Sequence, residues 1–165
     1  MIRSIRQKIS CKGAKTQSYP DAIPIQWPTR RGLSVISAMT ENEIAKIVVD
    51  VAYQIHRKLG PGLLESVYHA VMVYELRKRG LRVKSKDPVP IIWEDVRLDI
   101  GFETDIFVED LDMVELKSVE EVHRVFKKQL LTYLRLTDCR LGLLINFGAE
   151  LIKDGIFRVV NGLED

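Results

Sequence analysis

Three charged residues interrupt a stretch that otherwise alternates like two half-buried strands. Residues 104–118 read TDIFVEDLDMVELKS and contain Asp105, Glu115 and Lys117. Because side chains alternate between the two faces of a strand, a three-residue turn at 109–111 would place Asp105 across from Glu115 and the apolar residues together on the other face. Two adjacent carboxylates repel each other unless a cation lies between them. The spacing therefore favours a hard divalent cation, with Mg²⁺ as the first choice.

Lys117 follows Glu115 by two residues and therefore lies on the same face of its strand. A lysine beside a bound metal can orient or deprotonate a water molecule, or stabilise charge that develops on a phosphate. The alternative is an ordinary solvent-facing strip of salt bridges, which the spacing alone does not exclude. The sequence contains no Walker loop, no Rossmann glycine pattern and no zinc cluster.

A capping box predicts where the first helix begins. Thr40 is followed three residues later by Glu43, and apolar residues at helical spacing continue until Gly60-Pro61 ends the helix. Two further helices are predicted over 63–79 and 121–136. The core candidates on the first two helices are Ile44, Ile47, Val48, Val51, Ile55, Leu59, Leu64, Val67, Tyr68, Val71 and Leu76.

Strand signals occupy most of the chain beyond the second helix. The predicted extended segments are 81–86, 89–93, 96–108, 113–118, 141–147 and 155–160. The resulting order, ααβββαββ, predicts an α/β (α+β) fold with a mixed central β-sheet flanked by helices. A chain of 165 residues is long enough to bury the core of one such domain.

The first 38 residues differ in composition from the rest of the chain. They contain seven Lys and Arg residues against one acidic residue, three of the six prolines, and no regular periodicity. We expect a loosely ordered basic extension ahead of a domain at 39–165, with translation from Met39 as an alternative. Residues 39–165 then carry a formal charge of −4, so any binding of a polyanion by this domain depends on local patches.

Composition excludes several classes of protein. Hydrophobic residues make up 46% and charged residues 29% of the chain, as in soluble globular proteins. The apolar runs are too short to span a bilayer, and no secretory signal follows the basic N-terminus. Cys11 and Cys139 lack metal-ligand spacing and predict no disulfide framework. A cytoplasmic setting without a membrane partner is expected.

Further motifs accompany the acidic pair. They are Gly62-x-x-Glu65-x-x-Tyr68 in GPGLLESVY, Gln129-x-x-x-Tyr133 in QLLTYL, and LGLLINF at 141–147. The spacing of Asp105, Glu115 and Lys117 resembles the D…(D/E)xK signature of the PD-(D/E)xK nuclease superfamily. In order and spacing, residues 40–162 resemble a complete protein of the GxxExxY family, which is assigned to this superfamily. The resemblance implies a restriction-endonuclease-like core.

The resemblance also implies a metal site. Asp105 and Glu115 would hold Mg²⁺ or Mn²⁺ together with the backbone carbonyl of Leu116. Glu65, on the helix that precedes the sheet, would be an additional acid near the metal. For Glu65, the alternative is a solvated helix acid.

Three more site residues follow from the same resemblance. Lys117 would act on the attacking water. Gln129 and Tyr133 are four residues apart on one helix face and would position the lysine or the nucleic-acid backbone. For Tyr133, and likewise for Tyr68, the alternative is core packing with the hydroxyl group satisfied.

Two positions depart from the family pattern. Glu103 stands where family members usually carry a basic residue, and Phe126-Lys127-Lys128-Gln129 replaces His-Glu-Ala-Gln. His123 is out of register with the lost histidine and is not assigned its role. A basic stretch near the end of the second helix consists of Arg77, Lys78, Arg79, Arg82, Lys84 and Lys86. For its first three residues, complementing the helix dipole is the favoured interpretation.

The sequence thus predicts an Mg²⁺-dependent nuclease that acts on nucleic acid, with DNA as the first expectation and RNA as the alternative. A second hypothesis is a catalytically inactive nuclease-fold module that binds nucleic acid or a protein partner. A structural subunit of a larger assembly is a third. The oligomeric state stays open, with a homodimer among the alternatives.

Overall fold

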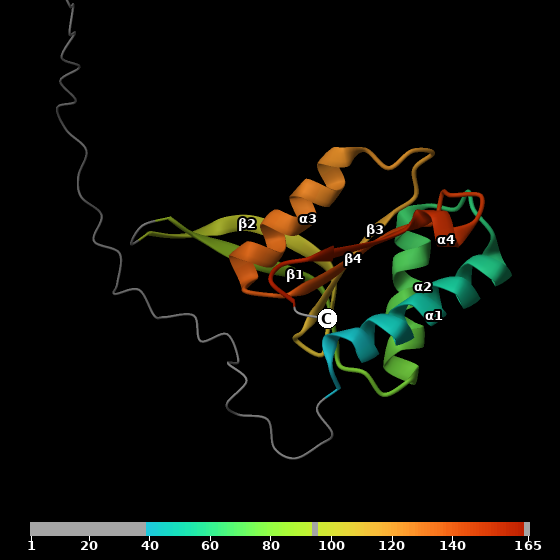
Figure 1. Cartoon of the computed structure of the whole chain (residues 1–165), viewed down its shortest axis with the longest axis horizontal. Helices are drawn as coiled ribbons and strands as arrows, with labels where there is room; N and C mark the ends of the chain where they lie inside the picture. Colours follow the sequence, from blue (N-terminus) through green and yellow to red (C-terminus); the bar gives the residue numbers. More distant parts are fainter. Residues whose placement is uncertain (1–38, 94–95, 164–165) are drawn as a thin grey trace, which may run out of the picture.

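The computed structural model describes residues 39–93 and 96–163, so the predicted N-terminal extension lies outside the described part. The elements are α1 (Glu41–Leu59), α2 (Glu65–Lys78), β1 (Val83–Trp93), β2 (Val96–Val108), β3 (Asp112–Lys117), α3 (Arg124–Thr137), β4 (Leu141–Asn146), α4 (Ile152–Gly155) and β5 (Ile156–Val160). The five strands form one mixed sheet, with α1 and α2 on one face and α3 on the other (Figure 1). The predicted fold class is confirmed, and the short helix α4 is added to the predicted order.

Helix α1 begins at the predicted capping box. The Thr40 amide donates to the Glu43 carboxylate at 2.7 Å, and the Glu43 amide donates to the Thr40 hydroxyl at 3.3 Å. These bonds satisfy amide groups that have no partner within the helix. The predicted stripe is buried at Ile44, Val48, Val51 and Ile55, whereas Leu59 is exposed and Ile47 is half-buried. No helix within the described ranges is long and apolar enough to cross a membrane.

The predicted core face of α2 is wrong at two positions. Leu64 is 75% exposed and Val67 is 39% exposed. The helix starts at Glu65, so Leu64 lies ahead of its first turn, where a side chain need not follow the helical stripe. The buried stripe contains the predicted Tyr68 and Leu76, together with Met72 and Val73.

A hairpin between β2 and β3 has the predicted three-residue turn. Val108 pairs with Asp112 and Ile106 with Val114, which leaves 109–111 as the turn. The apolar side chains opposite Asp105 and Glu115 lie together on one face, as predicted, and they join the core beneath α1 and α2. The apolar side chains on the other face pack under α3. Strand β3 then pairs in parallel with β4, with α3 as the crossover. The C-terminal end of β3, which carries Glu115 and Lys117, therefore lies between β2 and β4 in the sheet.

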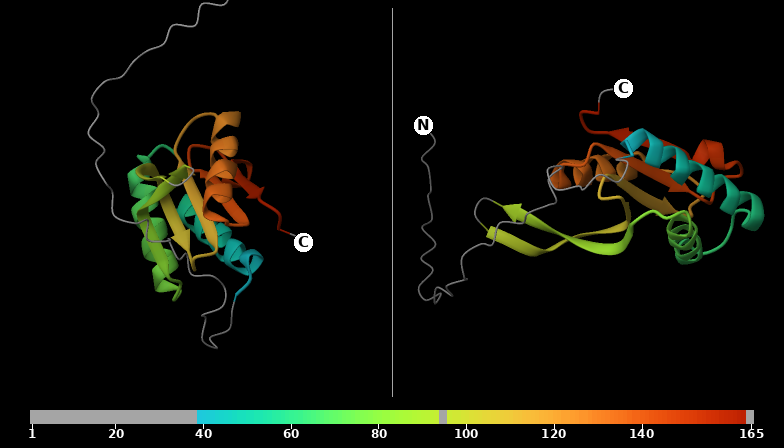
Figure 2. Two further views of the ribbon diagram at one scale, coloured as in Figure 1. Left: turned by 90° about the vertical axis from the view of Figure 1, so that its left-hand side faces the viewer. Right: turned by 90° about the horizontal axis from the view of Figure 1, so that it is seen from below.

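Strands β1 and β2 continue beyond the body of the domain as a two-stranded ribbon (Figure 2). The two extended segments predicted over 81–93 are a single strand here, although its register shifts between Val89 and Ile91. At this bulge a Cβ atom on Gly101 would lie 1.6 Å from the carbonyl oxygen of Val89, so only glycine permits the close approach. Phe102 stacks on Tyr133 with ring centroids 3.7 Å apart, which ties the ribbon to α3.

Candidate active site

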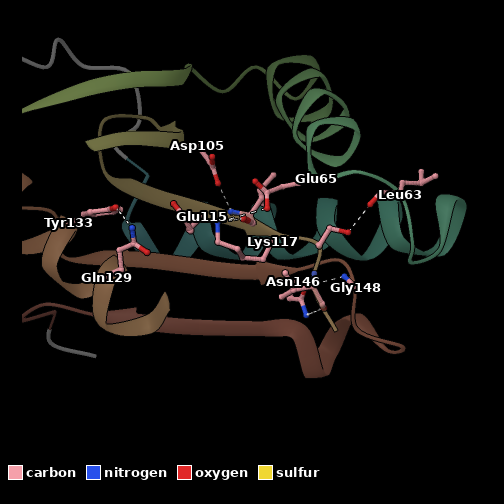
Figure 3. A network of polar contacts seen from close by, with 12 residues as sticks. Leu63, Glu65, Asp105, Glu115, Lys117, Gln129, Tyr133, Asn146 and Gly148 are labelled. Carbon is pink, nitrogen blue, oxygen red and sulfur yellow. Dashed lines mark hydrogen bonds and ion pairs between the residues drawn. The ribbon is translucent and has the colours of Figure 1, made fainter. Parts of the chain in front are cut away.

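The β2–β3 pair brings the two predicted acids together. The register, continued one step beyond the pairing of Ile106 with Val114, places Asp105 opposite Glu115. The Leu116 amide donates to Oδ2 of Asp105 at 2.8 Å, so this carboxylate is held against β3 (Figure 3). Both side chains thus extend from regular strands, which hold a site more rigidly than loops do.

Lys117 lies between these acids and the first residue of α2. Its Nζ donates at 2.7 Å to Oε1 of Glu115 and at 2.7 Å to the carbonyl oxygen of Leu116. Oε2 of Glu65 lies 3.9 Å from the same nitrogen. The side chains of Lys117 and Glu115 are only 16% and 12% exposed, so their ion pair is screened little by solvent.

The charges in this cluster perturb each other. Burial raises the pKa of Glu115, and the neighbouring carboxylates of Asp105 and Glu65 raise it further, while Lys117 acts in the opposite direction. Burial disfavours the charge of Lys117, but the hydrogen bond and ion pair with Glu115 and the charges of Glu65 and Asp105 outweigh this and raise its pKa. Lys117 is therefore protonated at neutral pH.

The oxygen atoms around Lys117 are chemically suited to a hard divalent cation. Glu115 Oε1 and the Leu116 carbonyl both point to one position, and the ammonium group of Lys117 stands there as a cation. Carboxylate and carbonyl oxygens are ligands that Mg²⁺ accepts alongside water. Among the residues that the structure describes, no group of three or more His, Cys, Asp or Glu side chains is arranged to hold a metal. A metal would therefore depend on the two acids, the carbonyl and water, and Lys117 would have to move aside.

The loop before α2 is fixed by Tyr68. This side chain is fully buried and stacks on Phe147 with ring centroids 4.4 Å apart. Its hydroxyl donates to the Gly60 carbonyl at 2.6 Å and accepts the Leu63 amide at 3.1 Å. The structure thus shows the alternative given for Tyr68, which is core packing with the hydroxyl group satisfied. Glu65 follows this loop, with a side chain that is 44% exposed.

Gln129 and Tyr133 form a pair of their own on α3. The Gln129 amide donates to the Tyr133 hydroxyl, and no hydrogen bond or ion pair between described residues joins either of them to Lys117. The predicted site residues therefore fall into two groups. One group consists of Asp105, Glu115, Lys117 and Glu65, which lie together. The other is the pair of Gln129 and Tyr133 on α3. The ring centroid of Phe126 lies 5.6 Å from Lys117 Nζ.

Two residues that the sequence motifs did not indicate support the site. His69 Nε2 donates to the Asp105 carbonyl oxygen at 2.9 Å and lies 3.1 Å from Ser85 Oγ, so it steadies β2 at the first acid. Asn146 is buried, and its carboxamide bonds both backbone groups of Val119. His69 is four residues after Glu65 on one helix face, which is a signal that sequence analysis can use.

The basic stretch after α2 is largely engaged in ion pairs. Arg82 bonds Glu109 at 2.9 Å, and Lys84 lies 2.7 Å from Asp110. Arg79, at the end of α2, pairs with an acid of α1. These ion pairs join α2, the ribbon and the β2–β3 turn. A structural role therefore accounts for most of the basic residues in this stretch.

Comparison with known proteins identifies a family. The family model described as the PD-(D/E)XK nuclease superfamily matches residues 42–159, which include α1 through most of β5 and all the predicted site residues. The comparisons with curated proteins and with solved structures gave no match.

Proposed function

Because the chain belongs to the PD-(D/E)XK nuclease superfamily, we propose that it hydrolyses phosphodiester bonds of nucleic acid with a divalent metal, Mg²⁺ or Mn²⁺. Nucleases of this superfamily generally use divalent metals. The observation that carries the proposal is the convergence of Glu115 Oε1 and the Leu116 carbonyl on one cation position, with Asp105 beside them. The motifs around Glu65 and Tyr68 support membership of the GxxExxY family within the superfamily.

Asp105, Glu115 and the Leu116 carbonyl would hold the ion, with Glu65 at the edge of the site. When bound, the ion would supply Lewis-acid stabilisation of the phosphoryl oxygens and a more acidic water. Lys117 would act on the attacking water or stabilise the developing phosphate charge. Gln129 and Tyr133 would contact the nucleic-acid backbone at the edge of the site. DNA is the expected substrate, with RNA as the alternative, and the cytoplasm is the expected setting.

The experiment is cleavage of single- and double-stranded DNA and RNA with Mg²⁺ and with Mn²⁺. We expect Asp105→Asn and Glu115→Gln to lower the rate by about 100-fold or more, because each removes a ligand of an ion worth several kcal/mol to the transition state. The matched control is Glu121→Gln, an exposed acid outside the cluster, which is expected to retain full activity. Absence of cleavage by the wild-type protein on all four substrates would contradict the proposal.

A second candidate function is a nuclease-fold module that binds nucleic acid or a protein partner without cleaving. The observation that favours it is the ammonium group of Lys117 at the cation position, beside a phenylalanine where the family pattern has a histidine. Calorimetric titration with Mn²⁺ separates the two candidates. Binding that disappears in Glu115→Gln supports the nuclease, whereas nucleic-acid binding without metal binding supports the module.

A further inference from the structure

An open pocket of about 520 Å³ lies directly beyond the C-terminal end of β3. Its walls are the loop 61–65, the segment 118–120 and Gly148. Glu65 belongs both to this pocket and to the charged cluster, since its carboxylate is 3.9 Å from Lys117 Nζ. A ligand in the pocket would therefore be an immediate neighbour of a group that reacts at Lys117.

Hydrogen bonds hold the walls of the pocket in place. Ser118 Oγ donates to the Leu63 carbonyl at 2.7 Å and joins the two main walls (Figure 3). The Asn146 carboxamide accepts the amides of Val119 at 3.0 Å and Gly148 at 3.1 Å, and it donates to the Val119 carbonyl at 2.8 Å. The pocket is thus preformed, which lowers the entropic cost of binding a ligand.

The pocket offers hydrogen-bond acceptors and apolar surface. Its charged side chains are the acids Glu65 and Glu120, and no basic residue occurs among the described residues that line it. A phosphate would be repelled there. The exposed side chains of Leu63 and Leu64 provide apolar area for a flat ring. The chemistry matches an uncharged ligand that combines a ring face with hydrogen-bond donors.

We propose that this pocket binds the nucleoside next to the scissile phosphate, an inference that rests on the proposed function and specifies where its substrate lies. The nucleoside is the part of a nucleic acid that has a flat ring, carries no charge and donates hydrogen bonds. Two of its donors vary among the common nucleosides in a way that a comparison can separate, the exocyclic amino group of the base and the 2′-hydroxyl of ribose. The carboxylate of Glu120 accepts either one.

The test is a titration of the full chain followed by backbone amide shifts in NMR spectra. The probes are adenosine, 2′-deoxyadenosine, uridine and thymidine, with inorganic phosphate as a control ligand. We expect the amides of Leu64, Val119 and Gly148 to shift. Equal affinity for the two adenine nucleosides, above uridine and thymidine, assigns the contact to the amino group. Equal affinity for adenosine and uridine, above the deoxynucleosides, assigns it to the 2′-hydroxyl.

A pair of neighbouring acids provides matched variants. Glu120→Ala is expected to weaken binding about tenfold, as loss of a hydrogen bond to a charged group does, whereas Glu121→Ala, outside the pocket, leaves it unchanged. Absence of shifts at these amides, thymidine binding as tightly as the other three nucleosides, shifts with phosphate alone, or equal behaviour of the two variants overturns the inference. Nucleoside binding without any cleavage refutes only the enzymatic proposal, and cleavage without nucleoside binding refutes only the pocket.

Discussion

Replacing Asp112 by asparagine is expected to remove a steep pH dependence from the stability of this domain. Asp112 begins β3 with no solvent exposure, and neither of its carboxylate oxygens has a hydrogen-bond partner in the described part of the chain. Burial raises its pKa to about 8, the charge of Glu41 contributes in the same direction, and Arg158 acts against both. The folded protein therefore keeps this carboxyl group protonated at neutral pH.

The sign and the size of the effect follow from the difference in pKa. The carboxyl group has an ordinary pKa of 3.8, so the folded state binds one more proton than the unfolded state between that pH and about 8. The free energy of unfolding falls by about 1.4 kcal/mol per pH unit across this window. Relative to its value below pH 3.8, the free energy of unfolding is lower by about 4 kcal/mol at pH 7 and by about 6 kcal/mol above pH 8. Stability from this group is fully present below pH 3.8.

Asparagine keeps the shape of the side chain but does not titrate in this range. Its buried amide has two N–H donors where the protonated carboxyl group has one O–H, and the additional unpartnered donor would cost about 1–3 kcal/mol, independent of pH. Asp112→Asn is therefore expected to be less stable than the wild type at pH 4 and more stable at pH 7 and above, with the two curves crossing near about pH 5.

The assay is urea unfolding at intervals from pH 4 to pH 9 for both proteins. The matched control is Asp138→Asn, an exposed acid close to the same end of the sheet, in a left-handed conformation that asparagine also adopts. Its curve should run parallel to that of the wild type. If the Asp112→Asn curve is also parallel to the wild-type curve, the buried carboxyl group does not titrate as argued and the reasoning fails.

Three further predictions concern the site and its supports. Lys117→Met is expected to abolish cleavage yet to tighten Mn²⁺ binding, because the ammonium group no longer competes for the metal ligands; calorimetry that finds weaker binding contradicts this. Tyr68→Phe keeps the stack on Phe147 but loses two hydrogen bonds, and urea unfolding should show a loss of about 1–3 kcal/mol, whereas an unchanged midpoint is evidence against the loop anchor. Gly148→Ala would bring a Cβ atom 2.3 Å from the Val119 carbonyl, and a loss of about 1–3 kcal/mol is expected in the same assay, with full stability as the contrary result.

Local rules predicted the parts of the fold that depend on neighbours in sequence. The capping box at Thr40 and the turn at 109–111 are set by residues a few positions apart, and both are confirmed. The prediction that Asp105 lies opposite Glu115 required only that the turn contain an odd number of residues. The predicted burial of Leu64 is wrong, because helical spacing does not reveal at which residue the helix begins.

Contacts between distant segments were beyond such rules. The bond from His69 to the Asp105 carbonyl joins α2 to β2 across 36 positions, and it depends on how the helix packs against the sheet. The position of the Lys117 ammonium group depends on side-chain rotamers at the end of a strand, which the sequence pattern does not encode. The cation position around this group therefore became visible only in the structure.

The motif that links Gly62, Glu65 and Tyr68 combines two physical roles. Tyr68 is buried, and its hydroxyl holds the loop from Gly60 to Leu63, which sets the point at which α2 begins with Glu65. The Leu63 carbonyl in turn accepts the hydroxyl of Ser118, the residue after Lys117. One chain of hydrogen bonds thus fixes both Glu65 and the end of β3, and with them the 3.9 Å separation of Glu65 from the lysine. Glu65 lies beside the lysine, and Tyr68 supports its position from the core.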